Sequence, residues 1–516
     1  MKMFRRLGSL IMVVVLLLFS ASVAIAAEDP QPVRILYMDS TGFKYTNDLV
    51  IYQTWEEACN IDLQPEAVLS SEFETKFGAM LASGDLPDII NHTLSIDQVN
   101  ELGPKGLFLP ISDYLDQMPN VKAMLEQYPE EVELMKASDG KLYKIPTVKT
   151  ADVNTQGFCI RADILRESGV DVNSIKTMDD LLDALMALKE ANGGKPVYGI
   201  RSGGELREFT YFARAFGVYS QDFIGNIQYN NETGLFEYPV ASQNLKDAVA
   251  FFAKLYANGI LPADCMTMSD QQWDAANKAN ELFFFVDNCP NLPNFNQFVW
   301  NMGIDAEYVC IMPPEYNGKV YPWKSGRMLD FDYGDIINAK TKSLEGVLAL
   351  EDWLYNKDNL EYLVFGIEGE TCARDESGRL VNTMSGEEGT KINTEHYVFG
   401  INWNWCKYRP AFPYLQWDKT ALVYYPDAKT QDVIRQYEAV LEDLYTLPAD
   451  PVTRFSEEQS EDLKDYKTPI DTYLKENIAS FILNQKSMDE WDAFVEGFNK
   501  MNPDLIVEIY NAAAVQ

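Results

Sequence analysis

Tryptophans in polar surroundings are the side chains of this 516-residue chain with the most informative chemistry. A sugar ring presents apolar C–H faces that stack on an aromatic plane, and its hydroxyl groups need hydrogen-bond donors and acceptors. A cleft that combines tryptophan with Asp, Asn and Arg would meet both needs. Four candidate contacts are of this type, with packing in the core as the alternative for each: Trp300, Trp323, Trp403 and Trp405.

Polar residues also follow three apolar segments that we expect to be strands. Asp39, Ser71 and Asn91 lie in short polar loops at the ends of these segments. Ligands of parallel α/β sheets bind at the carboxyl ends of the strands. These three side chains are therefore candidate ligand contacts.

Loop position and side-chain type add further candidates. Arg201 and Glu205 lie in a loop after the apolar segment 197–200, and a solvated turn is the alternative. Asp330 and Tyr333 are candidate ligand contacts, and Asp330 lies in an alternating stretch that is typical of a strand. Its carboxylate could accept sugar hydroxyls or bind a cationic group, or it could face water on an edge strand.

One loop has the ligand spacing of a calcium site. Oxygen donors stand at positions one, three, five, nine and ten of this loop: Asp171, Asn173, the carbonyl of Ile175, Asp179 and Asp180. Hard oxygen ligands at alternating positions suit calcium. The loop departs from an EF-hand, because Lys176 and Leu182 replace the usual Gly and Glu. The alternative is a helix start capped by Thr177 and Asp180, and both interpretations can hold together.

Few residues are available for nucleophilic or zinc catalysis. The chain has two histidines, His92 and His396, and it contains no H-E-x-x-H, G-x-S-x-G or Walker sequence. We therefore expect a protein that is not an enzyme and requires no cofactor. A glycosidase stays open, because the separation of two carboxylates cannot be read from sequence.

The charge and the first residues indicate export. A basic stretch, an apolar segment and Ala24-Ile25-Ala26 predict a signal peptide over residues 1–27, with an uncleaved anchor as the alternative. Its removal would take the net charge from −35 to about −38, which repels nucleic acid and anionic membranes. The first cysteine is Cys59, so a lipid-anchored cysteine at the cleavage site is not expected. We predict an extracytoplasmic protein without a nucleic-acid partner.

The seven cysteines are widely spaced and form no C-x-x-C pair. This odd number at such spacings is not typical of a disulfide framework. Most are expected to be small buried residues, and one disulfide bond remains open.

Strands and helices are predicted to alternate in the first part of the chain. Residues 33–38 and 61–69 are expected strands, and the helix between them carries Tyr52, Trp55 and Ala58 on one stripe. A helix then ends at Gly84 and a strand follows at residues 88–90. This alternation predicts a parallel sheet. Later segments are predicted as helices 158–166, 177–190, 264–279 and 344–355, and as strands 197–200 and 282–286.

The segment Leu81-Ala82-Ser83-Gly84-Asp85-Leu86-Pro87-Asp88-Ile89-Ile90 resembles a motif of family 1 extracellular solute-binding proteins of carbohydrate ABC transporters. The stretches 109–114, 139–146, 366–370 and 487–492 are similar to the same family, in the same order. The resemblance implies an α/β fold of two lobes with an inter-lobe ligand cleft, as in type II, maltose-binding-protein-like receptors. It assigns residues 28–150 and 330–372 to one lobe, and 151–329 and 373–516 to the other.

The resemblance also implies a function and a site. Such a protein captures a carbohydrate, here expected to be an oligosaccharide, and delivers it to the transmembrane subunits of a permease. Glu370 becomes a candidate ligand contact through the match at 366–370, and the loop at 171–180 is similar to a calcium loop of alginate-binding relatives. We expect a monomer. The alternatives are a peptide or lipid-derived ligand on the same fold, a secreted glycosidase, or a solute sensor for a membrane kinase.

Overall fold

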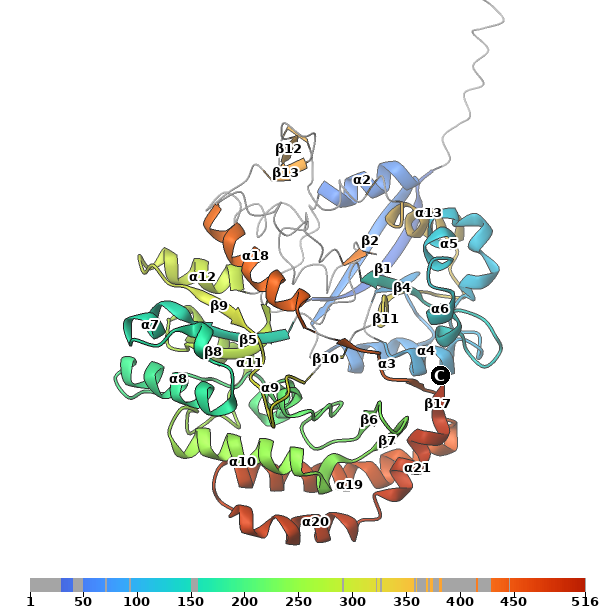
Figure 1. Cartoon of the computed structure of the whole chain (residues 1–516). Helices are drawn as coiled ribbons and strands as arrows, with labels where there is room; N and C mark the ends of the chain where they lie inside the picture. The colour runs from blue at the N-terminus through green and yellow to red at the C-terminus, as the bar shows by residue number, and fades with distance from the viewer. Residues whose placement is uncertain are drawn as a thin grey trace, which may run out of the picture.

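The chain folds into two lobes (Figure 1). The computed structural model describes residues 29–39, 50–69, 72–91, 94–149, 156–289, 292–321, 323–324, 327–356, 359, 368–369, 372–374, 380–382, 414–415, 428–444 and 446–515. The predicted signal peptide lies outside the described residues, as do four predicted ligand contacts: Ser71, Glu370, Trp403 and Trp405. The backbone of Asp39 is described, but its side chain is not.

A six-stranded sheet forms the centre of the first lobe, in the order β14-β4-β11-β3-β1-β2. The strands are β1 (Gln31–Asp39), β2 (Ile61–Leu69), β3 (Ile89–Asn91), β4 (Ile145–Lys149), β11 (Leu329–Ile337) and β14 (Tyr414–Leu415). Strand β1 runs parallel to β2 and β3, whereas β11 returns antiparallel between β3 and β4. The predicted strands at 33–38 and 61–69 and the parallel pairing are confirmed.

Helices cover both faces of this sheet, because successive residues of its central strands enter two different core clusters, as Ile89 and Ile90 do. They are α2 (Val50–Cys59), α3 (Phe73–Ser83), α4 (Ile96–Leu102), α5 (Pro119–Leu125), α6 (Pro129–Met135) and α13 (Leu344–Leu354). Tyr52 and Trp55 are buried as predicted, but Ala58 is exposed, so the predicted stripe is shorter. Gly84 ends α3 at φ 72°, a left-handed conformation that glycine adopts without strain.

A small antiparallel sheet lies inside the second lobe, in the order β8-β5-β9. Its strands are β5 (Gln156–Arg161), β8 (Phe284–Asn288) and β9 (Tyr308–Ile311), and a separate hairpin joins β6 (Gln228–Asn230) to β7 (Leu235–Glu237). The predicted helix at 158–166 is therefore wrong over its first half. Residues 157–161 are buried without a break, which suits a central strand rather than a helix with one apolar face.

Ten helices described in the second lobe surround this sheet. They are α7 (Ala162–Glu167), α8 (Met178–Ala191), α9 (Arg207–Ala213), α10 (Gln243–Ala257), α11 (Asp270–Lys278), α12 (Leu292–Asn301), α18 (Ala428–Glu442), α19 (Glu457–Ile482), α20 (Trp491–Asn499) and α21 (Asp504–Ala513). Figure 1 shows α19, α20 and α21 along the far side of this lobe from β5. The helix predicted at 177–190 is confirmed, whereas the one predicted at 264–279 begins later, at Asp270.

Several short strand pairs lie outside the two main sheets. Strand β10 (Trp323–Lys324) pairs with β15 (Thr446–Leu447), and β16 (Val452–Thr453) pairs with β17 (Ala514–Val515). A hairpin joins β12 (Cys372–Arg374) to β13 (Leu380–Asn382). Strand β14 and the buried Val452 lie with the first lobe, although the predicted boundary placed 373–516 in the second. No helix in the described part of the chain is long and apolar enough to cross a membrane.

Candidate ligand-binding site

One face of helix α9 carries polar and aromatic side chains near the lobe junction. Arg207 and Tyr211 are four residues apart, and Arg214 follows three residues later, so all three lie on the same face. This face is partly exposed, whereas Phe209 and Phe212 on the opposite face are fully buried. The burial of the phenylalanines fixes the helix and directs the arginines outward. We call Arg207, Tyr211, Arg214 and the adjacent Trp323 the α9 surface.

Contacts within the α9 surface hold its side chains in place. The guanidinium carbon of Arg214 lies 5.1 Å from the ring centre of Tyr211 and 5.4 Å from that of Trp323. Arg207 Nε donates to the Tyr211 hydroxyl at 3.1 Å. Among the described residues, neither arginine forms an ion pair. Their remaining N–H groups are therefore not committed to a described carboxylate.

Segments that connect the two lobes meet at this surface. Arg214 donates to the side chain of Gln156, the first residue of β5, which follows the crossing from β4. Trp323 in β10 precedes the return to β11, and its buried indole N–H has no hydrogen-bond partner among the described residues. Arg327 donates to the Asp450 carbonyl in a third connecting segment. Relative movement of the lobes would therefore change the contacts of the α9 surface.

Arg201, a predicted contact, is instead held by the second lobe. Its Nη1 lies 2.7 Å from Asp287 Oδ2, and its guanidinium lies 5.4 Å from the ring centre of Trp273. Burial opposes the charge of Arg201, yet Asp287 outweighs this effect and raises its pKa. The backbone N–H of Arg201 donates to Glu208 Oε2 at 2.7 Å. These partners fix the loop in which Arg201 lies.

The first lobe brings three polar groups together at the ends of its strands. Asn91 Nδ2 donates to Asp335 Oδ1 at 2.6 Å, and Lys144 Nζ donates to the carbonyls of Leu94 and Phe331 at 2.8 and 3.0 Å. Burial raises the pKa of Asp335 to about 6. We call Asn91, Lys144 and Asp335 the strand-end cluster. Of the predicted contacts, Asn91 lies in this cluster, and Asp39 ends the neighbouring strand β1.

The other predicted contacts are dispersed. Trp323 is fully buried within the α9 surface, whereas Trp300 donates its N–H to Ala306 and packs against a different core cluster. Asp330 accepts from the backbone N–H of Tyr333 at 3.1 Å, in a bulged part of β11. Glu205 is exposed in a short 3-10 helix. The structure therefore does not gather these residues into one site.

The predicted calcium loop contains oxygen donors and a helix cap. Asp180 Oδ2 accepts from the N–H of Thr177 at 2.8 Å, and Thr177 caps α8, as the alternative interpretation predicted. These hydrogen bonds lower the pKa of Asp180. The donor set suits calcium, but the carboxylates of Asp171, Asp179 and Asp180 are not all within 4.8 Å of one another in the described structure. Calcium binding would require them to converge.

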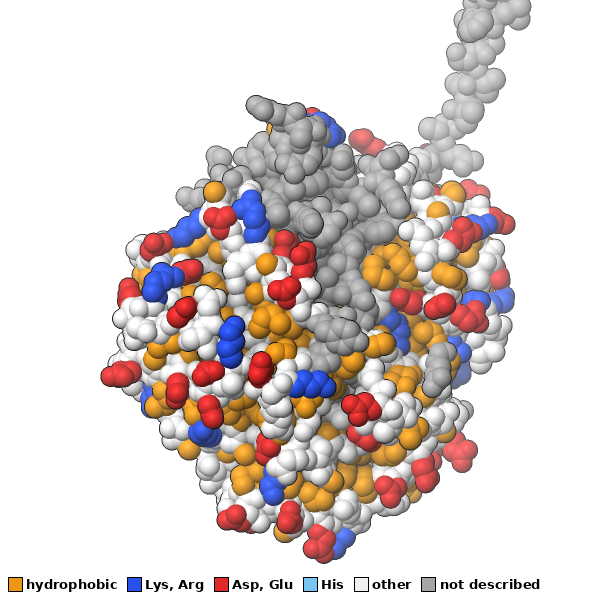
Figure 2. Space-filling model, viewed as in Figure 1, with side chains coloured by type: hydrophobic (Ala, Val, Ile, Leu, Met, Phe, Trp, Pro, Cys, Tyr) orange, Lys and Arg blue, Asp and Glu red, His pale blue; other side chains and the backbone are white. Residues whose placement is uncertain are grey.

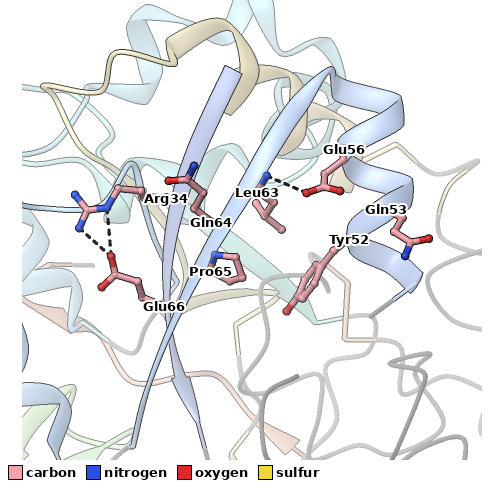
Figure 3. A pocket seen from close by; sticks show the side chains of 8 residues that line it. All are labelled: Arg34, Tyr52, Gln53, Glu56, Leu63, Gln64, Pro65 and Glu66. Atoms are coloured by element: carbon pink, nitrogen blue, oxygen red, sulfur yellow. Dashed lines mark hydrogen bonds and ion pairs between the residues drawn. The ribbon is translucent and has the colours of Figure 1, made fainter. Parts of the chain in front are cut away.

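A surface pocket of about 430 Å³ lies at the outer edge of the first sheet (Figure 3). Its lining consists of Arg34, Tyr52, Gln53, Glu56, Leu63, Gln64, Pro65 and Glu66. Arg34 pairs with Glu66 and Asp85 at 2.8 Å each, and Glu56 accepts from the Leu63 N–H at 3.1 Å. Strand β2 is one edge of the sheet, whereas β4, which leads to the second lobe, lies next to the other edge strand, β14. This pocket is therefore separate from the lobe junction.

Sequence reasoning missed Arg207, Tyr211 and Arg214. Their spacing on one helix face was readable, but no helix was predicted at this position. The contacts with Trp323 and Gln156 join residues far apart in sequence, so spacing alone could not reveal them.

A model of the bacterial extracellular solute-binding protein family matches residues 39–359, which is more than half of the chain. The protein belongs to this family. It is 27% identical over 252 residues to the fructooligosaccharide ABC transporter substrate-binding protein FusA of Streptococcus pneumoniae, covering 45% of this chain and 44% of FusA. It is also 27% identical over 217 residues to lipoprotein LipO of Bacillus subtilis, covering 40% of each chain. The matches span less than half the length of these relatives.

Solved structures show the same fold over nearly the whole chain. Alginate-binding protein AlgQ2 without calcium ion has a TM-score of 0.73 at 20% identity, covering 94% of this chain and 98% of AlgQ2. An HMO-binding, ABC-transporter-associated protein of Bifidobacterium longum infantis has a TM-score of 0.74 at 17% identity, with the same coverage. The predicted two-lobed α/β fold is confirmed.

Proposed function

We propose that the protein captures an oligosaccharide between its two lobes and delivers it to the membrane permease of an ABC importer. Membership of the solute-binding family and similarity to FusA support this proposal. The protein would act as an exported monomer, with no catalytic activity and no nucleic-acid partner. Figure 2 is consistent with this view, because acidic side chains are scattered over both lobes on the visible face.

The α9 surface is the observation that carries the proposal. Tyr211 supplies a partly exposed aromatic plane, Trp323 lies fully buried against Arg214, and two arginines outside described ion pairs supply N–H donors. Sugar rings need both kinds of partner. The surface also adjoins the connecting segments, so a ligand bound there can favour the closed arrangement of the lobes.

Isothermal titration of the mature protein against defined oligosaccharides and peptides tests this function. We expect saturable binding of an oligosaccharide class, with the ligand recovered unchanged after long incubation. Tyr211→Ala should weaken binding about tenfold or more, because an aromatic sugar platform is lost. Tyr466→Ala is the matched control, since Tyr466 is 49% exposed on α19.

Two results would reject the proposed function, and a third would reject the proposed site. Binding of peptides without any oligosaccharide would indicate the peptide receptor. Sustained release of shorter sugars would indicate a glycosidase. Equal sugar affinities of Tyr211→Ala and the wild type would move the site away from the α9 surface.

The loop at 171–180 would hold a structural calcium ion as an addition to this function. Its donors would be Asp171, Asn173, Asp179, Asp180 and the Ile175 carbonyl. Similar solved structures include AlgQ2 without calcium ion and a FusA EF-hand mutant with fructo-nystose. We expect calcium to raise the Tm above its value in chelator, because the ion binds the folded state.

Asp179→Asn should remove this rise in Tm, because it removes one carboxylate donor of the loop. Asp179 is exposed and its described partner is Lys254 at 3.5 Å, so the substitution should leave the fold intact. Asp183→Asn, on an exposed position of the same helix, should keep it. Equal melting temperatures of the wild type in calcium and chelator would rule the ion out.

A further inference from the structure

Three buried thiols meet in the sheet of the second lobe. Cys159 lies on β5, Cys289 directly follows β8, and Cys310 lies on β9. The Sγ atoms of Cys289 and Cys310 are 3.1 Å apart, and those of Cys159 and Cys289 are 3.9 Å apart. All three side chains are at most 1% exposed. Strands β5 and β9 and the residue that follows β8 thus each contribute one thiol to a single cluster.

Gly157 makes room for this cluster. A Cβ at position 157 would lie 2.4 Å from Cys289 Sγ and 2.7 Å from Cys310 Sγ, which is too close for real atoms. The two sulfur atoms therefore occupy space that a larger residue would fill. Strand pairing fixes the position of Cys159, the third cysteine of the cluster, because Cys159 and Cys310 are direct partners in the ladder between β5 and β9.

The surroundings favour a neutral form of sulfur. Trp273, Phe285 and Phe295 belong to the core cluster that encloses the thiols. Burial raises the pKa of Cys159 and Cys289, whereas hydrogen bonds from Cys159 and Cys289 lower the pKa of Cys310 to about 5, and no described Lys or Arg acts on the three sulfur atoms. Three thiolates around a divalent metal ion would leave one net negative charge buried with no described Lys or Arg to balance it, whereas a disulfide carries no charge.

The distances also favour a bond between two sulfurs. Zinc–sulfur bonds of about 2.3 Å hold tetrahedral ligands about 3.8 Å apart, which is longer than the contact between Cys289 and Cys310. A disulfide requires an approach of only about 1 Å from the present separation. We propose that Cys289 and Cys310 form a disulfide bond in the exported protein, and that Cys159 remains a free thiol beside it.

Cys289 and Cys310 would be oxidised by thiol–disulfide exchange with a donor disulfide. A donor disulfide accepts two electrons and becomes two thiols, while Cys289 and Cys310 lose two protons and form one S–S bond. Extracytoplasmic compartments supply such donors. The bond would close the loop over residues 290–309, which contains α12, and would anchor the end of β8 beside Asp287, the partner of Arg201.

The test uses the mature chain exported to the oxidising periplasm of a bacterial host. Free thiols are alkylated under denaturing conditions, and a non-reduced digest is mapped by mass spectrometry. We expect a cross-linked pair of peptides that contain Cys289 and Cys310, with Cys159 alkylated. Reduction should lower the Tm by several degrees, because the closed loop no longer restricts the unfolded chain.

Variants separate the disulfide from other uses of the cluster. Cys159→Ser should keep the cross-link and the effect of reduction, whereas Cys289→Ser should lack both. Alkylation of both Cys289 and Cys310 in the exported wild type would overturn the proposal, whether or not the variants fold. A bond between Cys159 and Cys289, or stoichiometric zinc lost equally from both variants, would overturn it as well.

Discussion

The strand-end cluster of the first lobe and the α9 surface of the second lobe use polar residues in opposite ways. In the strand-end cluster, Lys144 and Asp335 are almost fully buried and bond to protein groups. On the α9 surface, Arg207 and Arg214 are partly exposed and form no ion pair among the described residues. A buried polar group at a strand end can therefore stabilise the fold. A partly exposed polar group that forms no described ion pair is better suited to bind a ligand.

The largest expected effect comes from breaking the strand-end cluster. Lys144→Met should lower the free energy of unfolding by about 3 kcal/mol, because two buried carbonyls lose a donor and Asp335 loses a nearby positive charge. Urea unfolding measures the loss. Lys136→Met is the control, since Lys136 lies nearer the surface and pairs with an exposed glutamate.

This variant should leave ligand affinity of the folded protein nearly unchanged. A loss of affinity greater than that of the α9 variants would place the strand-end cluster in the ligand site and reverse the comparison.

The second effect concerns binding rather than stability. Arg214→Gln should weaken oligosaccharide binding by about 10- to 100-fold, since a charged donor is worth about 1.5–3 kcal/mol. The change should be visible by isothermal titration. Arg435→Gln on α18 is the control, because Arg435 is exposed and pairs with Asp432. Affinities that match between the two variants would exclude Arg214 from the site.

A third, smaller effect depends on pH. Glu208 is buried and accepts from the N–H groups of Arg201 and Val286, and burial raises its pKa to about 8. The folded state therefore retains a proton that the unfolded state has lost, so rising pH between about 4.5 and 8 should reduce stability. This contribution should be on the order of 1 kcal/mol or more.

Glu208→Gln removes the titration but also replaces one acceptor with an NH₂ group. The variant should be less stable than the wild type at pH 5, and the difference should narrow towards pH 8. Urea unfolding at several pH values tests this trend, and a difference that stays constant would show that Glu208 does not titrate in this range.

The smallest effect is expected at the exposed ion pair of Arg166 and Glu307. Glu307→Gln should change the Tm by less than about 1 °C, because solvent screens such pairs. A fall of several degrees would mean that surface pairing contributes to stability as strongly as the buried groups do.

Local patterns in the sequence determined much of the first lobe. In the first lobe, the apolar segments at 33–38 and 61–69 and the turn at Gly84 are visible in neighbouring residues, as is the capped start of α8 at Thr177 in the second lobe. Short-range periodicity and capping depend on contacts within a few residues, so they can be read without tertiary structure. The order of family motifs likewise indicated the two-lobed fold.

Tertiary structure decided which polar residues bond to other protein groups and which are available to bind a ligand. The sequence predicted a strand at 197–200 before Arg201, where the structure has only an isolated bridge at Tyr198, and only the fold brings Asp287 to the Arg201 guanidinium and Trp323 to Arg214. The same holds for Cys159, Cys289 and Cys310, whose distant positions meet on three strands of one sheet. Burial and pairing depend on these long-range neighbours, and therefore residue type and local spacing could not determine them.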